Sequence, residues 1–245
     1  MPDDHFGPDV AASYDVDVGG MFEPAAIEPV VDVLSELAGD GRALELAIGT
    51  GRIALPLAER GVEVCGIELS DAMVAQLRRK PGGGSLSVTI GDMAGTRVPG
   101  TFRLAYLVFN TIGNLTTQEQ QVACFANAAR HLESGGLFVV EVGVPELRRL
   151  PPGERHVLFH ADAQGYGIDE YDTASQRLIS HHIRWAGRDV HHRALPFRYV
   201  WPAELDLMAQ LAGMTLRSRW ADWHRRPFTH ESTAHVSIWC KAAGP

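Results

Sequence analysis

Scarcity of lysine, of long apolar runs and of positive charge excludes several classes of protein. Only Lys80 and Lys241 occur among 245 residues, so the glycine–lysine–serine/threonine ending of a P-loop is absent. No apolar stretch reaches the roughly 18 residues of a membrane-spanning helix, and the acidic first residues do not resemble a secretory signal. A net charge of −8 argues against binding along nucleic-acid phosphates, which needs a basic face. We therefore expect a cytoplasmic protein with neither a membrane nor a nucleic-acid partner.

Cysteine is also scarce. The three cysteines, Cys65, Cys124 and Cys240, are odd in number and far apart. This spacing predicts free thiols in a reducing compartment rather than disulfides or a zinc site. Apolar residues make up 45% of the chain and charged residues 21%, as in globular proteins. The length suits one large domain, or a core with a cap.

The stretch from Arg42 to Glu68 organises the rest of the chain. Residues 43–48 form a short apolar run with one acid, which is typical of a buried parallel strand. The turn at 49–51 contains two glycines, so the backbone can approach a ligand closely there. A helical pattern over 53–60 and a second apolar run ending at Glu68 complete a βαβ unit. A carboxylate in that place can accept two hydrogen bonds from a ribose diol, which favours a nucleotide-like ligand.

The glycine spacing distinguishes between nucleotides. A dinucleotide fingerprint would need its third glycine at Ala54. The stretch instead resembles the first motif of class I S-adenosylmethionine (SAM)-dependent methyltransferases, acid-x-Gly-x-Gly-x-Gly. Glu45 stands at the acid position, and Gly49 and Gly51 stand at the last two glycine positions. Ala47 occupies the first glycine position and departs from the pattern by one methyl group.

The resemblance implies a SAM site at the carboxyl ends of the first three strands. Glu68 would bind the ribose and Met73 would pack near the adenine. Asp92 would accept a hydrogen bond from the adenine amino group, with Met93 beside the ring; the alternative for Asp92 is a turn-forming role after a strand. The implied cofactor-binding set is Glu45, Ala47, Gly49, Thr50, Gly51, Glu68, Leu69, Met73, Asp92, Met93 and Phe109.

Three residues are expected in front of the reactive methyl group. By resemblance to small-molecule members, Tyr14 precedes the first helix and covers the cofactor; packing at the core edge is the alternative. Asn114 stands where amino-sugar N-methyltransferases carry a polar group near the acceptor. It can orient a substrate but cannot take a proton, or it caps a turn. Glu141 lies inside an apolar strand, so it either faces the site or pairs with an arginine.

Residues 145–200 are too many for a simple connection and read as four strands with a turn at 186–189. We interpret them as an antiparallel cap that selects the acceptor. Pairing about this turn places His181 and His192 on one, more apolar face, and His182, Arg184, His191 and Arg193 on the other. Histidines on one face are diagonal neighbours about 7–8 Å apart, and zinc needs three or four ligands, so we predict no metal. His181 or His192 is a candidate general base; the alternative is packing against a neighbour.

These patterns predict an α/β protein: a Rossmann-like, mixed seven-stranded sheet with helices on both faces and an inserted antiparallel β cap. Residues 1–144 and 201–245 would form the SAM-binding core, and residues 145–200 the cap over the substrate site. The predicted activity is SAM-dependent methyl transfer to an O, N or C nucleophile of a small molecule, by a monomer or homodimer. The alternatives are a SAM-binding regulator or scaffold without catalysis, and an NAD(P)-dependent oxidoreductase.

Overall fold

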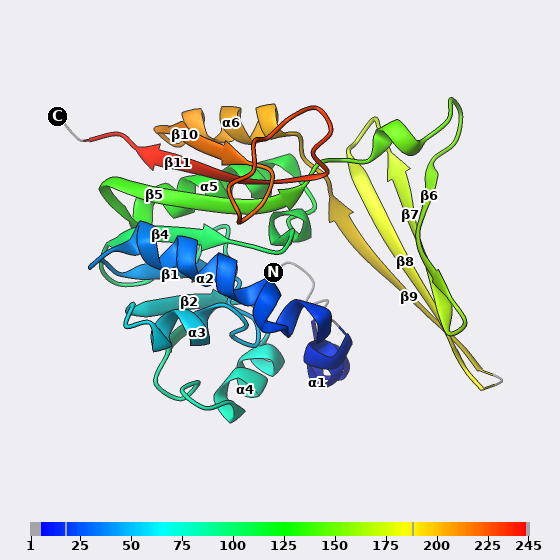
Figure 1. Cartoon of the computed structure of the whole chain (residues 1–245), viewed down its shortest axis with the longest axis horizontal. Helices are drawn as coiled ribbons and strands as arrows, with labels where there is room; N and C mark the ends of the chain where they lie inside the picture. Colours follow the sequence, from blue (N-terminus) through cyan, green and yellow to red (C-terminus); the bar gives the residue numbers. More distant parts are fainter. Residues whose placement is uncertain (1–5, 18, 188, 244–245) are drawn as a thin grey trace.

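A seven-stranded mixed sheet forms the centre of the protein (Figure 1). The structure is a computed structural model and describes residues 6–17, 19–187 and 189–243. The strand order is β10-β11-β5-β4-β1-β2-β3. β1 to β5 are parallel to one another, whereas β11 is antiparallel to both β5 and β10. The strands are β1 (Ala43–Leu46), β2 (Val64–Glu68), β3 (Ser87–Ile90), β4 (Phe102–Leu107), β5 (Leu132–Gly143), β10 (Met214–Trp220) and β11 (Ala234–Lys241).

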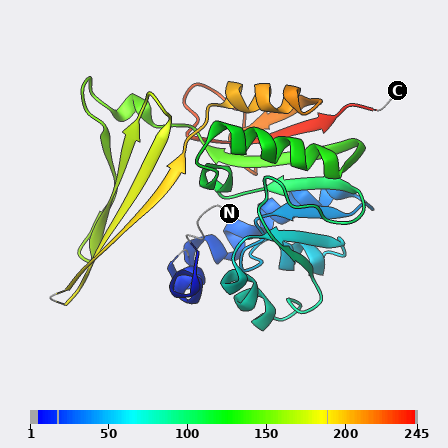
Figure 2. The ribbon, with the colours of Figure 1, turned by 180° about the vertical axis from the view of Figure 1, so that it is seen from behind.

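Helices cover both faces of this sheet, as its apolar strands require. α2 (Pro24–Ala38) and α3 (Ala54–Glu59) pack on the face toward the viewer in Figure 1. α5 (Gln118–His131) and α6 (Pro202–Leu211) pack on the other face, which is in front in Figure 2. α4 (Asp71–Arg79) follows β2, and its first turn is capped by the Ser70 hydroxyl, which accepts from the Met73 N–H. Each face has its own large cluster of buried apolar side chains.

The first helix of the chain was not expected from its sequence. α1 (Pro8–Asp17) contains Tyr14, which we had placed before the first helix. Only Ala11 is buried in α1, so the helix has no periodic apolar stripe for sequence analysis to detect. Short 3₁₀ turns follow at Gly19–Phe22, Thr111–Asn114 and Leu147–Arg149. β5 begins directly after α5, and residues 133–136 form an irregular step in the strand, where its pairing with β4 shifts in register.

Between β5 and α6 the chain forms a second, four-stranded antiparallel sheet, which stands apart from the first at the right of Figure 1. Its strands are β6 (His156–Asp162), β7 (Gly165–Asp172), β8 (Arg177–Ala186) and β9 (Asp189–Arg198). We call this sheet the cap. The register of the β8–β9 hairpin is the predicted one, with Trp185 opposite Val190 and His182 opposite Arg193. Arg188, within the predicted turn, lies outside the described residues. The predicted fold class is confirmed.

One buried arginine joins the cap to the large sheet's helices. Arg198, at the end of β9, is 5% exposed and forms an ion pair with Glu204 of α6 at 2.7 Å. Its other guanidinium nitrogen donates to the side-chain oxygen of Gln121 on α5 at 2.6 Å. A guanidinium that leaves water needs such partners, because an unpaired buried charge is strongly destabilising. The junction between the two sheets is therefore anchored by polar contacts.

Candidate functional site

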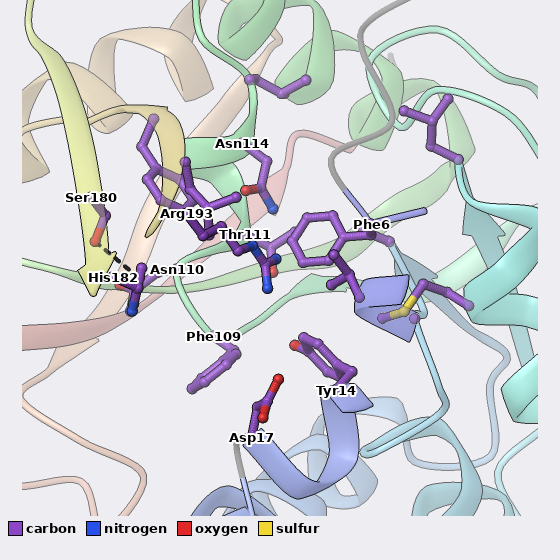
Figure 3. Close-up of a pocket in the computed structure, with 18 of the residues that line it drawn as sticks. Phe6, Tyr14, Asp17, Phe109, Asn110, Thr111, Asn114, Ser180, His182 and Arg193 are labelled. Atoms are coloured by element: carbon purple, nitrogen blue, oxygen red, sulfur yellow. Dashed lines mark hydrogen bonds between the residues drawn. The ribbon is translucent and has the colours of Figure 1, made fainter. Parts of the chain in front are cut away.

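A cavity of about 930 Å³ lies between the carboxyl ends of the parallel strands, α1 and the cap (Figure 3). Ligands of open α/β sheets bind at this edge. Three groups of residues line the cavity. The strand ends contribute Ala47, Gly49, Ile67, Glu68, Leu69, Met73, Gly91, Asp92, Met93, Phe109, Asn110, Thr111, Asn114 and Leu115; α1 and the residue near it contribute Phe6, Val10, Tyr14 and Asp17; and the cap contributes Phe159, Asp169, Ser180, His182, Arg184, His191, His192, Arg193, Leu195 and Phe197.

The glycine turn after β1 is held by the acid at the end of β2. The Glu68 carboxylate accepts a hydrogen bond from the Gly49 N–H at 2.8 Å and from the Ser70 N–H at 2.9 Å. Ala47, Gly49 and Gly51 all have left-handed φ angles, of 60°, 57° and 79°. Glycine adopts this region freely, whereas in alanine the Cβ makes a left-handed φ energetically unfavourable. Ala47 thus occupies the first glycine position of the motif, where the backbone conformation favours glycine.

Most of the expected cofactor residues line the cavity. Ala47, Gly49, Glu68, Leu69, Met73, Asp92, Met93 and Phe109 do so. Glu45, Thr50 and Gly51 do not, and two of these make contacts behind the wall. The Glu45 carboxyl is buried and accepts from the Tyr106 hydroxyl at 3.0 Å, and burial raises its pKa to about 8. The Thr50 hydroxyl donates to the Asp15 carboxylate at 2.6 Å.

α1 forms a wall of the cavity and is fastened to the glycine turn. Lys80 of the α4 end pairs with Asp15 at 2.5 Å and donates to the Thr50 carbonyl oxygen at 2.9 Å. Tyr14 points into the cavity beside Asp17 (Figure 3). Burial raises the pKa of the Tyr14 phenol, so it stays protonated near neutral pH. The expected position of Tyr14 at the site agrees with the structure, whereas the contributions of Phe6, Val10 and Asp17 had no sequence signal.

The turn after β4 is backbone-strained, and Glu141 holds it. Phe109 and Asn110 both have a φ of 60°, which is rare for bulky residues and common at functional sites. Glu141 on β5 accepts from the Phe109 N–H at 2.9 Å and from the Trp223 indole N–H at 2.8 Å. Glu141 is not among the residues that line the cavity, and no ion pair joins it to an arginine in the described part of the chain, so the structure matches neither of our two interpretations of Glu141. Asn114, at the end of the following 3₁₀ turn, does line the cavity.

The cap turns the face opposite to the expected one toward the cavity. His182, Arg184, His191 and Arg193 line it, together with His192, but His181 does not. His181 Nδ1 lies 3.0 Å from His192 Nε2, and its Nε2 lies 3.5 Å from Glu170. Both faces of the hairpin mix apolar and basic side chains, so alternation alone could not show which face is inward. Of the two candidate general bases, His192 therefore lines the cavity and His181 does not.

His182 is held beside other polar groups of the cap. Its Nε2 lies 3.3 Å from the Ser180 hydroxyl, and its ring packs edge-on against Phe159. Burial and then the charges of Arg193 and Arg184 lower the pKa of His182, which favours the neutral ring. Burial raises the pKa of Asp169 on the neighbouring strand, while a hydrogen bond from Ser180 opposes that rise. Within the described ranges no three metal-binding side chains converge on one point, and no helix has the length and apolar character of a membrane span.

Comparisons with known proteins fit this geometry. A family model described as a methyltransferase domain matches residues 43–136. The chain is 27% identical over 226 residues to a cypemycin N-terminal methyltransferase of a Streptomyces species, covering 90% of this chain and 91% of that protein. The solved structure of the CcbJ methyltransferase from Streptomyces caelestis is 33% identical, with 98% of both chains covered and a TM-score of 0.84. SAM-bound CalS10, an amino pentose methyltransferase from Micromonospora echinaspora, shares the fold at 21% identity with a TM-score of 0.69, covering 94% of this chain and 96% of its own.

Proposed function

The chain belongs to the SAM-dependent methyltransferases, and on that premise we propose that it methylates an amine nitrogen of a small molecule bound between α1, the β4 turn and the cap. The observation that carries the proposal is the two-sided cavity. One side is built from the strand-end residues of the motif, and the other from the polar face of the cap. Its volume of about 930 Å³ is near the top of the range for ligand pockets, about 300–1,000 Å³, which leaves room for a cofactor and an acceptor.

We place the cofactor on the strand-end side. Glu68 would accept from the ribose, Asp92 from the adenine amino group, and Met73 and Met93 would pack on the adenine. Asp92 already accepts from the Ala94 N–H at 2.8 Å through one carboxylate oxygen, which fixes its orientation. Glu45, Thr50 and Gly51 would support this side from behind. Thr50 does so by tying α1 to the turn, and Gly51 because a Cβ there would meet Leu77 at 2.3 Å.

The choice of nitrogen rests on the relatives and on the groups available in the cavity. One relative is named as an N-terminal methyltransferase and another as an amino pentose methyltransferase. SAM supplies a methyl group on a positively charged sulfur, so the acceptor nitrogen must present a free lone pair. Tyr14 and Asn114 would orient that nitrogen and exclude water. His182, whose burial favours the neutral ring, or His192 would accept the proton that the ammonium form has to lose.

Ligand-induced stabilisation and turnover test the proposal. SAM and S-adenosylhomocysteine (SAH) should each stabilise the fold by about 2.7 kcal/mol at 100 times their dissociation constant, and NAD should not. Formation of SAH should be seen with small primary or secondary amines and not with the matching alcohols. Equal turnover of the alcohols would show that the protein is not selective for nitrogen.

The ribose acid gives a sharper test of the cofactor side. Glu68→Gln should weaken SAM binding by about 1.5–3 kcal/mol, the value of a hydrogen bond to a charged group. We choose glutamine rather than alanine because Glu68 is buried and holds the glycine turn. Glu63→Gln, at an exposed acid paired with Arg42, is the matched control and should bind SAM as the wild type does. Unchanged affinity of Glu68→Gln in calorimetry would remove the ribose role.

A further inference from the structure

The cap wall of the cavity carries arginines in a protein whose net charge is −8. Arg184 on β8 and Arg193 on β9 lie on the same face of the cap, diagonally across the strand pair, and both line the cavity. His182 and His191 lie on that face beside them. Clustered positive charge in a concave site raises the local concentration of anions. This raises the question of which negatively charged group lies against the cap wall of the cavity.

Arg193 has no counter-charge within the described part of the chain. It is half-buried, yet no hydrogen bond or ion pair joins it to any described residue. Arg198, five residues along the same strand, shows the opposite situation, with Glu204 and Gln121 as partners. The nearest carboxylate to Arg184 is Asp162, with 4.0 Å between nitrogen and oxygen. A partly buried cation without a partner is costly to keep, so its retention in a ligand cavity points to a ligand.

The carboxylates of the cavity lie mostly across from the arginines. Glu68, Asp92 and Asp17 belong to the strand ends and α1. In Figure 3 Arg193 reaches into the cavity from the cap side, whereas Tyr14 and Asp17 enter from the opposite side. Asp169 is the cap's own carboxyl in the cavity, and no ion pair joins it to Arg193. The cavity thus has an acidic side toward the cofactor motif and a basic side toward the cap.

We propose that Arg193, assisted by Arg184, binds an oxyanion of the methyl acceptor, so that the substrate is an amine that also carries a carboxylate or a phosphate ester. This inference rests on the proposed function, because it assigns the acceptor to the cap side. A guanidinium binds either oxyanion through two parallel N–H donors, which fixes orientation as well as charge. With the oxyanion held at Arg193, the amine at the other end of the acceptor is directed toward Tyr14 and Asn114.

Matched pairs of acceptors test the substrate class. The carboxylate arm compares amino acids with their amides, and the phosphate arm compares amino-sugar phosphates with the free amino sugars. SAH formation is measured at constant ionic strength. In at least one arm the anionic member should have a kcat/KM at least tenfold higher, mainly through a lower KM, and the arm that shows this identifies the oxyanion. Equal kcat/KM within every pair would overturn the proposal.

The variant Arg193→Gln tests the residue. It should reduce the difference between the two members of a pair to about twofold and leave SAH affinity within twofold of the wild type. Arg177→Gln is the matched control, because Arg177 lies on β8 but does not line the cavity. It should keep the full difference. Loss of SAH affinity in Arg193→Gln as large as the loss of anionic-acceptor turnover would assign Arg193 to the cofactor instead.

A binding measurement separates failure of this inference from failure of the proposed function. In the SAH complex, inorganic phosphate or acetate should raise the melting temperature of the wild type and of Arg177→Gln but not of Arg193→Gln. This readout needs no turnover. If SAH binds and no amine is methylated, the proposed function fails, and a shift that depends on Arg193 still supports the anion site. If neither anion raises the melting temperature, or if Arg193→Gln shows the same rise as the wild type, the anion site is overturned whatever the turnover shows.

Discussion

The large sheet and the cap keep their shapes by different means. Every residue of β1 and β2 is buried, and apolar clusters pack on both faces of the large sheet. In the cap, β6 buries one residue of seven, and the only cluster formed by buried cap residues in the described chain centres on Val157, Tyr171 and Tyr199. The cap is thus held by strand pairing and by the Arg198 junction rather than by a core.

This difference matches a division of tasks. The cofactor side needs fixed geometry, and a deeply packed sheet provides it. The cap side can carry arginines, histidines and serine toward the ligand, because few of its residues are required for packing. On the proposed function, a thin acceptor-binding sheet beside a deeply packed one would allow the acceptor side to change while the cofactor side keeps its geometry.

A matched pair of phenylalanine substitutions should give the largest contrast. Phe138→Ala on β5 should lower the free energy of unfolding by about 3–5 kcal/mol, because the side chain is fully buried against Phe125 and Trp239. Phe159→Ala on β6, where 43% of the residue is exposed, should lower it by about 1 kcal/mol or less. Urea unfolding measures both. Equal losses would mean that the cap contributes as much to the stability of the fold as the core does. Phe138→Leu removes less volume and should give a loss between those of Phe138→Ala and Phe159→Ala.

Histidine titration should give the next contrast. His235 on β11 is fully buried, its Nδ1 lies 2.8 Å from the Ser237 hydroxyl, and no described residue pairs with its Nε2. Burial, and then Arg219, lowers its pKa to about 4. Between pH 6.5 and 4 the unfolded chain therefore binds a proton that the folded chain does not, and stability should fall by about 2 kcal/mol from pH 7 to pH 5.

The difference between wild type and His235→Gln isolates this contribution. Glu45 acts in the opposite direction, because its raised pKa makes its contribution present at low pH and lost as the pH rises through about 8. That contribution is common to both proteins and cancels. A His235→Gln profile parallel to that of the wild type would show that His235 does not cause the acid sensitivity.

The smallest expected effect concerns strain on the cofactor side. Ala47→Gly should relieve about 1–2 kcal/mol of left-handed backbone strain. Glycine costs about 0.5–1 kcal/mol in lost chain entropy, so the net gain in stability should be about 0.5–1 kcal/mol. Ala58→Gly in α3 is the same substitution at a helical position and should lose about that amount. Chemical denaturation compares the two, and a loss at both positions would mean that the Ala47 turn stores no strain.

The cofactor side was largely predictable from the sequence, because its residues are close in the chain and fixed by local patterns. Strand periodicity and the glycine turn predicted the positions of Gly49 and Glu68, and both line the cavity. Glu141 was not predictable, because its partner Trp223 lies 82 residues away on a loop. The inward face of the cap was not predictable either. The pairing of His182 with Arg193 could be read from the turn, but which face meets the cavity depends on how the cap sits on α5 and α6.

The place of β11 in the large sheet has a consequence for the order of assembly. β11 follows β10 in the sequence but lies between β10 and β5, so among the described strands β10 pairs with β11 alone. A nascent chain that has left the ribosome only as far as β10 can pair β5, β4, β1, β2 and β3, but β10 can join the sheet only after β11 has been synthesised. The two strands therefore join as one hairpin, carrying the fully buried Trp239 into the apolar cluster with them. Because this closure pairs residues about 100 positions apart, we expect it to be a late step of folding.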